Sequence, residues 1–249
     1  MVQRKNKKAV LYLVELSLLT AVVLLLQLAG ITLRLPFLAT PISLVGIPIA
    51  LGAMLLGPGA GAWLGFVFGA EVVLVLGVMG QDPFTSILFQ DHPILTTLLC
   101  LTKSTVAGLG AGLIYKYCTK LPNTVRTVLA SLSVPVLNTG IFILGSYTML
   151  DTFQTNFLGD GTSMFYFLVI GCAGVNFLFE FAVNGILSPV LQRLITILSK
   201  RIGDATQDRN GGALKEKLLA KVPSLYAWLA IGGLAILVLI VQLVLISKA

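Results

Sequence analysis

The chain has 249 residues, of which 57% are hydrophobic and only 11% are charged, and its formal net charge is +7. A soluble domain carries about twice that charged fraction, so these few charges could not cover the surface of a water-soluble globule. The composition excludes an ordinary cytosolic enzyme, a disordered chain and a typical nucleic-acid-binding protein, and it predicts a membrane protein with several spanning segments.

Seven apolar segments approach or exceed the length of about 20 residues that a spanning helix needs. In chain order they cover residues 9–29, 42–56, 60–79, 93–115, 124–148, 163–188 and 223–246. They lack the alternating pattern of barrel strands, which predicts an all-α integral membrane protein. We expect a six-helix domain over residues 1–198 that ends in an amphipathic stretch after Pro189. A cytoplasmic polar loop over 199–222 and an additional transmembrane helix within 223–249 are expected to follow.

Lysine and arginine residues are gathered in alternate segments between the apolar spans. If the N-terminus is cytoplasmic, the basic residues within 4–8, 116–126 and 193–221 all lie inside. The outer segments then keep only Arg34 and Lys248, while they carry several aspartates. The positive-inside rule therefore predicts a multi-pass cell-membrane protein with a cytoplasmic N-terminus and, after the seventh helix, an outside C-terminus.

Four polar side chains within the spans fall at similar depths. Glu71 and Lys103 lie roughly 12 and 15 Å below the outer ends of their helices, and Asn138 and Asn176 roughly 15 to 18 Å below theirs. A structural ion pair or a helix-joining hydrogen bond could explain each residue singly. Their convergence from four helices predicts one polar cavity, with Glu71 and Lys103 paired or facing it together.

The outer loops provide a second set of candidate binding residues. Arg34 lies in the first outer loop, and Gln81, Asp91 and His92 lie between the third and fourth spans. These side chains could close over a small polar ligand, although solvated loop residues would look the same. His92 is the only histidine, and with Asp91 alone it does not make a metal site.

Other residues in the spans are expected to serve packing or partner contacts. Glu15 and Glu180 lie near the inner ends of their predicted helices, where we expect cytoplasmic-side contacts. Ser17 and Ala21 form a small-xxx-small pair that could pack within the bundle or dock onto another membrane protein. Small residues at four-residue spacing on the third and fourth spans predict close helix contact; they are Gly57, Gly61, Gly65, Gly69, Gly108 and Gly112.

Several stretches carry a family likeness. They are LSLLTAVVLLLQ, LRLPF, PISLVGIPIALGAMLLGPGAGAWLGFVFG, PILTTLLCLTKSTVAGLGAGLIYK and VLASLSVPVLNTGIFILG. Over residues 9–190 the chain resembles the substrate-binding S component of energy-coupling factor (ECF) vitamin transporters. The resemblance implies a six-helix fold and a pocket that opens outward under the outer loops. It also implies a membrane T component and two ATPases as partners, and a first-helix docking stripe whose positions here are Ser17 and Ala21. The seventh span is not part of that pattern.

The favoured function is therefore capture of a vitamin-like micronutrient from outside. A pocket with both charge signs suits a ligand with a carboxylate or an amide, such as pantothenate or folate, and riboflavin or a corrin-type ligand stays open. Two alternatives remain: an intramembrane enzyme on a lipid-like substrate, with Glu71 or Asp91 as base and Lys103 as stabiliser, and a ligand-free scaffold. No phosphate loop, HExxH or GxSxG sequence is present, so we expect no catalytic residue, metal or cofactor.

Overall fold

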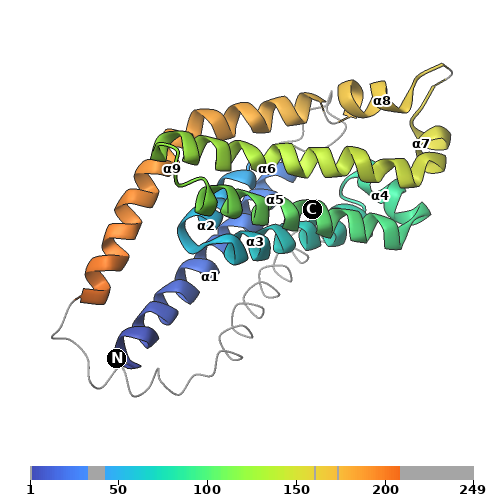
Figure 1. Cartoon of the computed structure of the whole chain (residues 1–249). Helices are drawn as coiled ribbons and strands as arrows, with labels where there is room; N and C mark the ends of the chain where they lie inside the picture. Colours follow the sequence, from blue (N-terminus) through green and yellow to red (C-terminus); the bar gives the residue numbers. More distant parts are fainter. Residues whose placement is uncertain (1, 33–42, 160, 173, 208–249) are drawn as a thin grey trace.

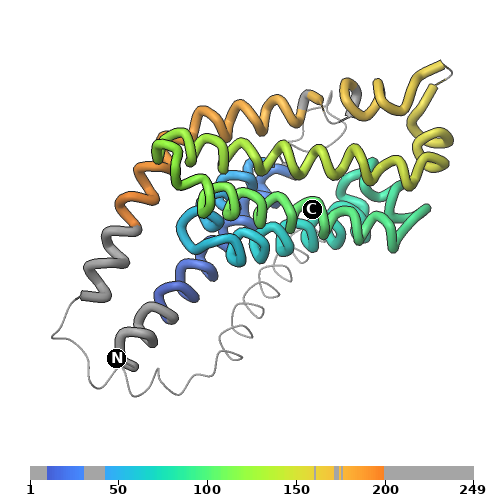
Figure 2. Tube along the Cα trace, in the orientation of Figure 1, coloured from blue at the N-terminus to red at the C-terminus, as the bar shows by residue number. Residues whose placement is uncertain are grey.

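The computed structural model describes residues 2–32, 43–159, 161–172 and 174–207 (Figures 1 and 2). All regular structure in these ranges is helical, which confirms the all-α class. Arg34 and the predicted seventh helix lie outside the described residues. The elements are α1 (Val2–Thr32), α2 (Gly46–Leu56), α3 (Pro58–Glu71), η1 (Val72–Val78), α4 (Pro83–Asp91), α5 (Pro93–Tyr117), α6 (Asn123–Ser146), η2 (Tyr147–Met149), α7 (Leu150–Asn156), α8 (Met164–Tyr166), η3 (Phe167–Cys172) and α9 (Gly174–Gln207).

Five of the described helical segments are long and apolar enough to cross a bilayer, which establishes a multi-pass membrane protein. They cover Val10–Gly30, Pro58–Val78, Pro93–Tyr117, Asn123–Asn156 and Asn176–Leu198. The predicted second span corresponds to α2, whose 11 residues rise only about 17 Å. The six-span count is thus not established, because α2 is apolar but too short to cross the hydrocarbon alone.

The short helix α2 lies at the centre of the bundle. It contacts α1, α3, α5, α6 and α9, and its side chains at Ile49, Ala50 and Ala53 are almost wholly buried. A helix that is apolar on every side is covered either by other helices or by lipid, and here other helices cover most of it. Leu16 and Leu24 of α1 pack into the same hydrophobic core, so α2 is the element around which the longer helices assemble.

The most extensive helix contact joins α3 to α5 through glycines. A Cβ atom built on Gly61 would collide with the carbonyl oxygen of Gly108, and one on Gly65 with that of Ser104. A Cβ on Gly69 would lie 2.5 Å from the carbonyl oxygen of Cys100. The two backbones approach each other because these positions have no side chain, as the spacing predicts.

Gly65→Ala is therefore expected to destabilise the bundle. The added methyl group meets backbone rather than a flexible side chain, and overpacking of this kind costs about 1–3 kcal/mol. Thermal melting of the purified protein should show a drop of several degrees. Gly140→Ala on α6 is the matched control, because its Cβ would meet nothing within 4 Å. An equal melting temperature for Gly65→Ala and the wild type would contradict the tight contact.

A second, smaller core closes one end of the bundle, where α4, α7 and α8 lie together (Figure 1). We call α4, η2, α7, α8 and η3 the cap. Its centre is a cluster of rings in which Phe84 lies 4.9 Å from Phe157 and 6.0 Å from Phe153, measured between ring centroids. Phe142 of α6 also contacts Phe84. The cap is thus a packed unit rather than a set of solvated loops.

The predicted sixth span, residues 163–188, differs from the structure at its C-terminal end. Helical structure covers Met164–Cys172 and, after residue 173, which lies outside the described residues, α9 from Gly174. This helix continues through Pro189 to Gln207, into the segment predicted as a loop. A proline removes one hydrogen bond, which a membrane helix tolerates where neighbouring groups compensate.

Candidate functional site

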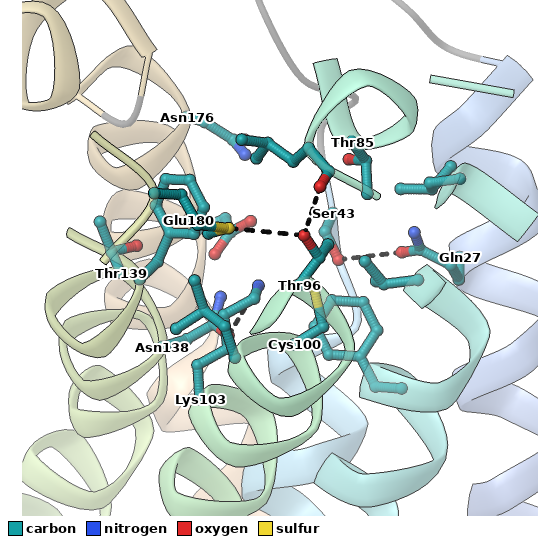
Figure 3. A pocket seen from close by; sticks show the side chains of 17 residues that line it. Gln27, Ser43, Thr85, Thr96, Cys100, Lys103, Asn138, Thr139, Asn176 and Glu180 are labelled. Atoms are coloured by element: carbon teal, nitrogen blue, oxygen red, sulfur yellow. Dashed lines mark hydrogen bonds between the residues drawn. The ribbon is translucent and has the colours of Figure 1, made fainter. Parts of the chain in front are cut away.

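A cavity with a volume of about 110 Å³ lies between the cap and the main core (Figure 3). Its apolar wall includes Phe68, Val72 and Leu76 from the α3–η1 segment and Leu88 from α4. Polar side chains reach it from almost every surrounding segment; they are Gln27, Ser43, Thr85, Thr96, Lys103, Asn138, Thr139, Asn176 and Glu180. Apolar walls with a few convergent polar groups are typical of small-molecule sites.

Lys103 of α5 is the cation of this cavity. Its Nζ donates to Asn138 Oδ1 on α6 at 3.3 Å, and Ser104 Oγ donates to the same oxygen at 3.4 Å. The rings of Phe68 and Phe142 flank the ammonium group, each with its centroid 5.8 Å from Nζ. An ammonium group has three donors, so Lys103 can hold a ligand acceptor while Asn138 fixes its position.

Asn176 and Glu180 line the cavity from α9, one helical turn apart on the same face (Figure 3). Glu180 was expected near the inner end of its helix, and the structure corrects that placement. The helix runs past Pro189 to Gln207, so its inner end lies well beyond Glu180, which lines the same cavity as Asn176. Lys103 bonds to Asn138 rather than to Glu180, so both charges face the cavity from different sides.

Glu71 is buried but does not line this cavity. The cavity-facing positions of its segment are Phe68, Val72 and Leu76, which recur every four residues. Glu71 precedes Val72 by one residue and therefore points about 100° away around the helix. The pairing of Glu71 with Lys103 stays a prediction.

Two predicted outer residues contact α7: Asp91, the last residue of α4, and His92, which directly precedes α5. His92 Nε2 lies 3.0 Å from both carboxylate oxygens of Asp151. Asp91 accepts hydrogen bonds from Thr152 Oγ1 at 3.0 Å and Asn156 Nδ2 at 3.3 Å. These residues do not line the cavity; they fasten the cap above it.

Of the other two predicted loop residues, Gln81 does not line the cavity. Gln81 follows η1, where its backbone N–H donates to the carbonyl oxygen of Val75 at 3.3 Å. Arg34 lies outside the described residues. No group of three or more potential metal ligands occurs in the described ranges.

Comparison with protein families shows which family the chain belongs to. Residues 11–192 match the family described as the substrate-specific component of ECF transporters. The chain belongs to this family. Comparison with curated proteins and with solved structures gave no significant match. The S component is therefore a substrate-binding subunit of an ECF transporter, and the family implies association with a T component and an ATPase module.

The enzyme alternative is not favoured for this S component. Members of the family bind substrates for transport. The two carboxylates considered as bases, Glu71 and Asp91, also lie outside the cavity that Lys103 lines.

On the first helix of the S component, Ser17 and Ala21 are only partly covered by the rest of the described chain. Ser17 Oγ donates to the carbonyl oxygen of Leu13 within α1, at 2.8 Å, which satisfies the hydroxyl group internally. The neighbouring side chains Val14 and Leu18 are 59% and 64% exposed. This face of α1 therefore presents small and apolar groups away from the bundle.

The sequence did not indicate most of the hydroxyl groups that line the cavity. It also predicted cytoplasmic-side contacts for Glu180, which lines the cavity. Thr96 Oγ1 donates to the carbonyl oxygen of Leu88 at 2.7 Å and so ties α5 to the cap. Thr85 is positioned by Asp82, which accepts from its N–H and its hydroxyl group. The spacing of Thr96 and Lys103, two helical turns apart, could have indicated their common face.

Proposed function

We propose that this S component captures a vitamin-like micronutrient with a carboxylate or an amide group. The observation that carries the proposal is the Lys103 ammonium, which is held by Asn138 and flanked by two rings in a capped cavity. A carboxylate is the natural partner of a desolvated ammonium group. Asn176 and Glu180 offer amide and carboxylate groups for the N–H or O–H groups of the same ligand.

In this proposal the ligand reaches the cavity from outside when the cap moves. The present volume of about 110 Å³ is small beside the roughly 300–1,000 Å³ of pockets that hold drug-sized ligands. The cap contacts made by Asp91 and His92 lie beyond the cavity and can break without disturbing the main core. Closure of the cap then removes water and strengthens the Lys103 contact.

Delivery depends on the T component and two ATPase subunits in this proposal. The N-terminus is cytoplasmic, the C-terminus lies outside after the seventh helix, and the α1 face around Ser17 and Ala21 docks on the T component. A partner can release the ligand only if it favours a state of lower ligand affinity. In this proposal, ATP-driven reorientation of the bundle supplies the difference in ligand affinity between the two states.

The test is mass spectrometry of small molecules released by denaturing the purified, extensively washed protein. We expect one tightly held compound, near one molecule per chain, that carries a carboxylate or an amide. An enzyme would instead release or produce a lipid-derived compound. Protein that binds no small molecule, after purification from cells and on direct titration with vitamins, would support the scaffold alternative and contradict the proposal.

A further inference from the structure

A second cavity lies at the other end of the bundle from the cap. Its volume is about 330 Å³, and it is formed by the α2–α3 turn, the last turn of α5 and the first turn of α6. Figure 1 shows the α5–α6 connection beside α2 at this end. The lining residues that matter here are Leu56, Gly57, Pro58, Tyr115, Lys116 and Arg126.

Two cations face this cavity, and none of its lining residues is acidic. The guanidinium carbon of Arg126 lies 4.1 Å from the centroid of the Tyr115 ring, so one face of the group is stacked. The Lys116 ammonium lies 5.3 Å from the centroid of the Tyr117 ring. Stacking orients a guanidinium group but leaves its edge donors available for an oxyanion.

These cations are not neutralised within the described part of the chain. Arg126 Nε is buried and has no hydrogen-bond partner there. A buried donor without an acceptor costs about 1–3 kcal/mol, and more when it is charged. The arrangement therefore calls for an anion that the described residues do not supply.

The carbonyl groups at the C-terminal ends of α2 and α5 are an internal alternative. The last four carbonyls of a helix lack intrahelical partners, and a nearby cation gains about 0.3–1 kcal/mol from the helix dipole. Such an attraction suits the placement of Lys116 or Arg126 near Leu56. These carbonyl groups do not bond to Arg126 Nε, which has no hydrogen-bond partner in the described part of the chain.

Exposed apolar side chains lie within three residues of the two cations along α5 and α6. Leu113 on α5 and Val125 and Leu129 on α6 are each about 40% exposed, and they lie within or at the ends of spanning segments. Exposed apolar side chains in a span meet acyl chains. A cationic pocket bordered by such side chains has the chemistry of a phospholipid site.

We propose that this cavity binds the phosphate group of an anionic phospholipid, with Arg126 and Lys116 as its charged contacts. Arg126 offers paired donors to two phosphate oxygens, and Lys116 adds a second positive charge. The acyl chains lie along the exposed side chains of α5 and α6. The site is separate from the ligand cavity and does not depend on which micronutrient the protein carries.

The experiment is native mass spectrometry of the full chain, delipidated and titrated with phosphatidylglycerol or with phosphatidylcholine of identical acyl chains. We expect at least tenfold preference for phosphatidylglycerol, and at least a tenfold loss of that binding in Arg126→Gln and in Lys116→Gln. Lys120→Gln is the matched control, because it removes the same charge from an exposed position outside the cavity lining. It should change binding by less than twofold.

Four outcomes would overturn the proposal. Equal binding of both lipids would show that the anionic headgroup is not recognised. Equal losses in Lys120→Gln and Arg126→Gln would reduce the effect to general surface charge. Displacement of the lipid by an equal concentration of inorganic phosphate would identify a site for free phosphate. Unchanged lipid binding with lost association to the transporter partners would identify a protein interface. Lys116→Gln keeps the test valid if Arg126→Gln does not fold, because Lys116 is exposed.

Discussion

Lys103→Ala is expected to abolish ligand binding while the protein still folds. Removing one partner of a desolvated, charge-assisted contact costs about 2–5 kcal/mol, which corresponds to a loss of affinity of at least about 30-fold. The fold should tolerate the change, because Asn138 Oδ1 still accepts a hydrogen bond from Ser104. Isothermal titration with the co-purified compound measures the affinity, and thermal melting measures the fold.

Ser104→Ala is the matched control for this prediction. It removes the other hydrogen bond to Asn138 but leaves the Lys103 ammonium in place. We expect its affinity to stay within a few-fold of the wild type. Unchanged affinity in Lys103→Ala would show that the ligand does not contact the ammonium group, and the assignment of the cavity would fail.

Ala21→Leu is expected to leave ligand binding intact and to block uptake. The larger side chain would project from the partly covered face of α1, beside the exposed Leu18, and would keep a partner helix from approaching closely. Ligand titration on the purified protein and uptake by cells that express the complete transporter separate the two effects.

Ala182→Leu provides the same substitution at an exposed position on α9. It should retain uptake, because the added bulk then meets lipid rather than the proposed partner. Uptake that persists in Ala21→Leu would contradict docking through this face of α1. Lost ligand binding in Ala21→Leu would indicate damage to the bundle instead.

Depth along the helices was a good guide to part of the site. Lys103, Asn138 and Asn176 were grouped because they lie at similar levels, and all three line one cavity. Depth carries no information about which way a side chain points around its helix axis. Glu71 shares that level but lies on a different face from Val72, so it was grouped with the others without sharing their cavity.

The rest of the site was harder to predict, because the sequence did not indicate where the helices begin and end. The glycine spacing on α3 and α5 was sufficient to predict their close contact, because that pattern is local. The placement of Glu180 required the continuation of α9 through Pro189, which depends on tertiary packing. The π-helical turn η1 at Val72 and Leu76 is likewise a product of packing that no periodicity signals.

The most direct test of the binding site compares the thiols of Cys100 and Cys118. Cys100 lines the ligand cavity, whereas Cys118 lies at the opposite end of α5. Alkylation by a small maleimide, followed by peptide mass spectrometry, reports on both thiols in one sample. If the cavity holds the transported compound, saturating ligand should slow modification of Cys100 at least tenfold and leave Cys118 unchanged. Equal rates of Cys100 modification with and without ligand would contradict binding in this cavity.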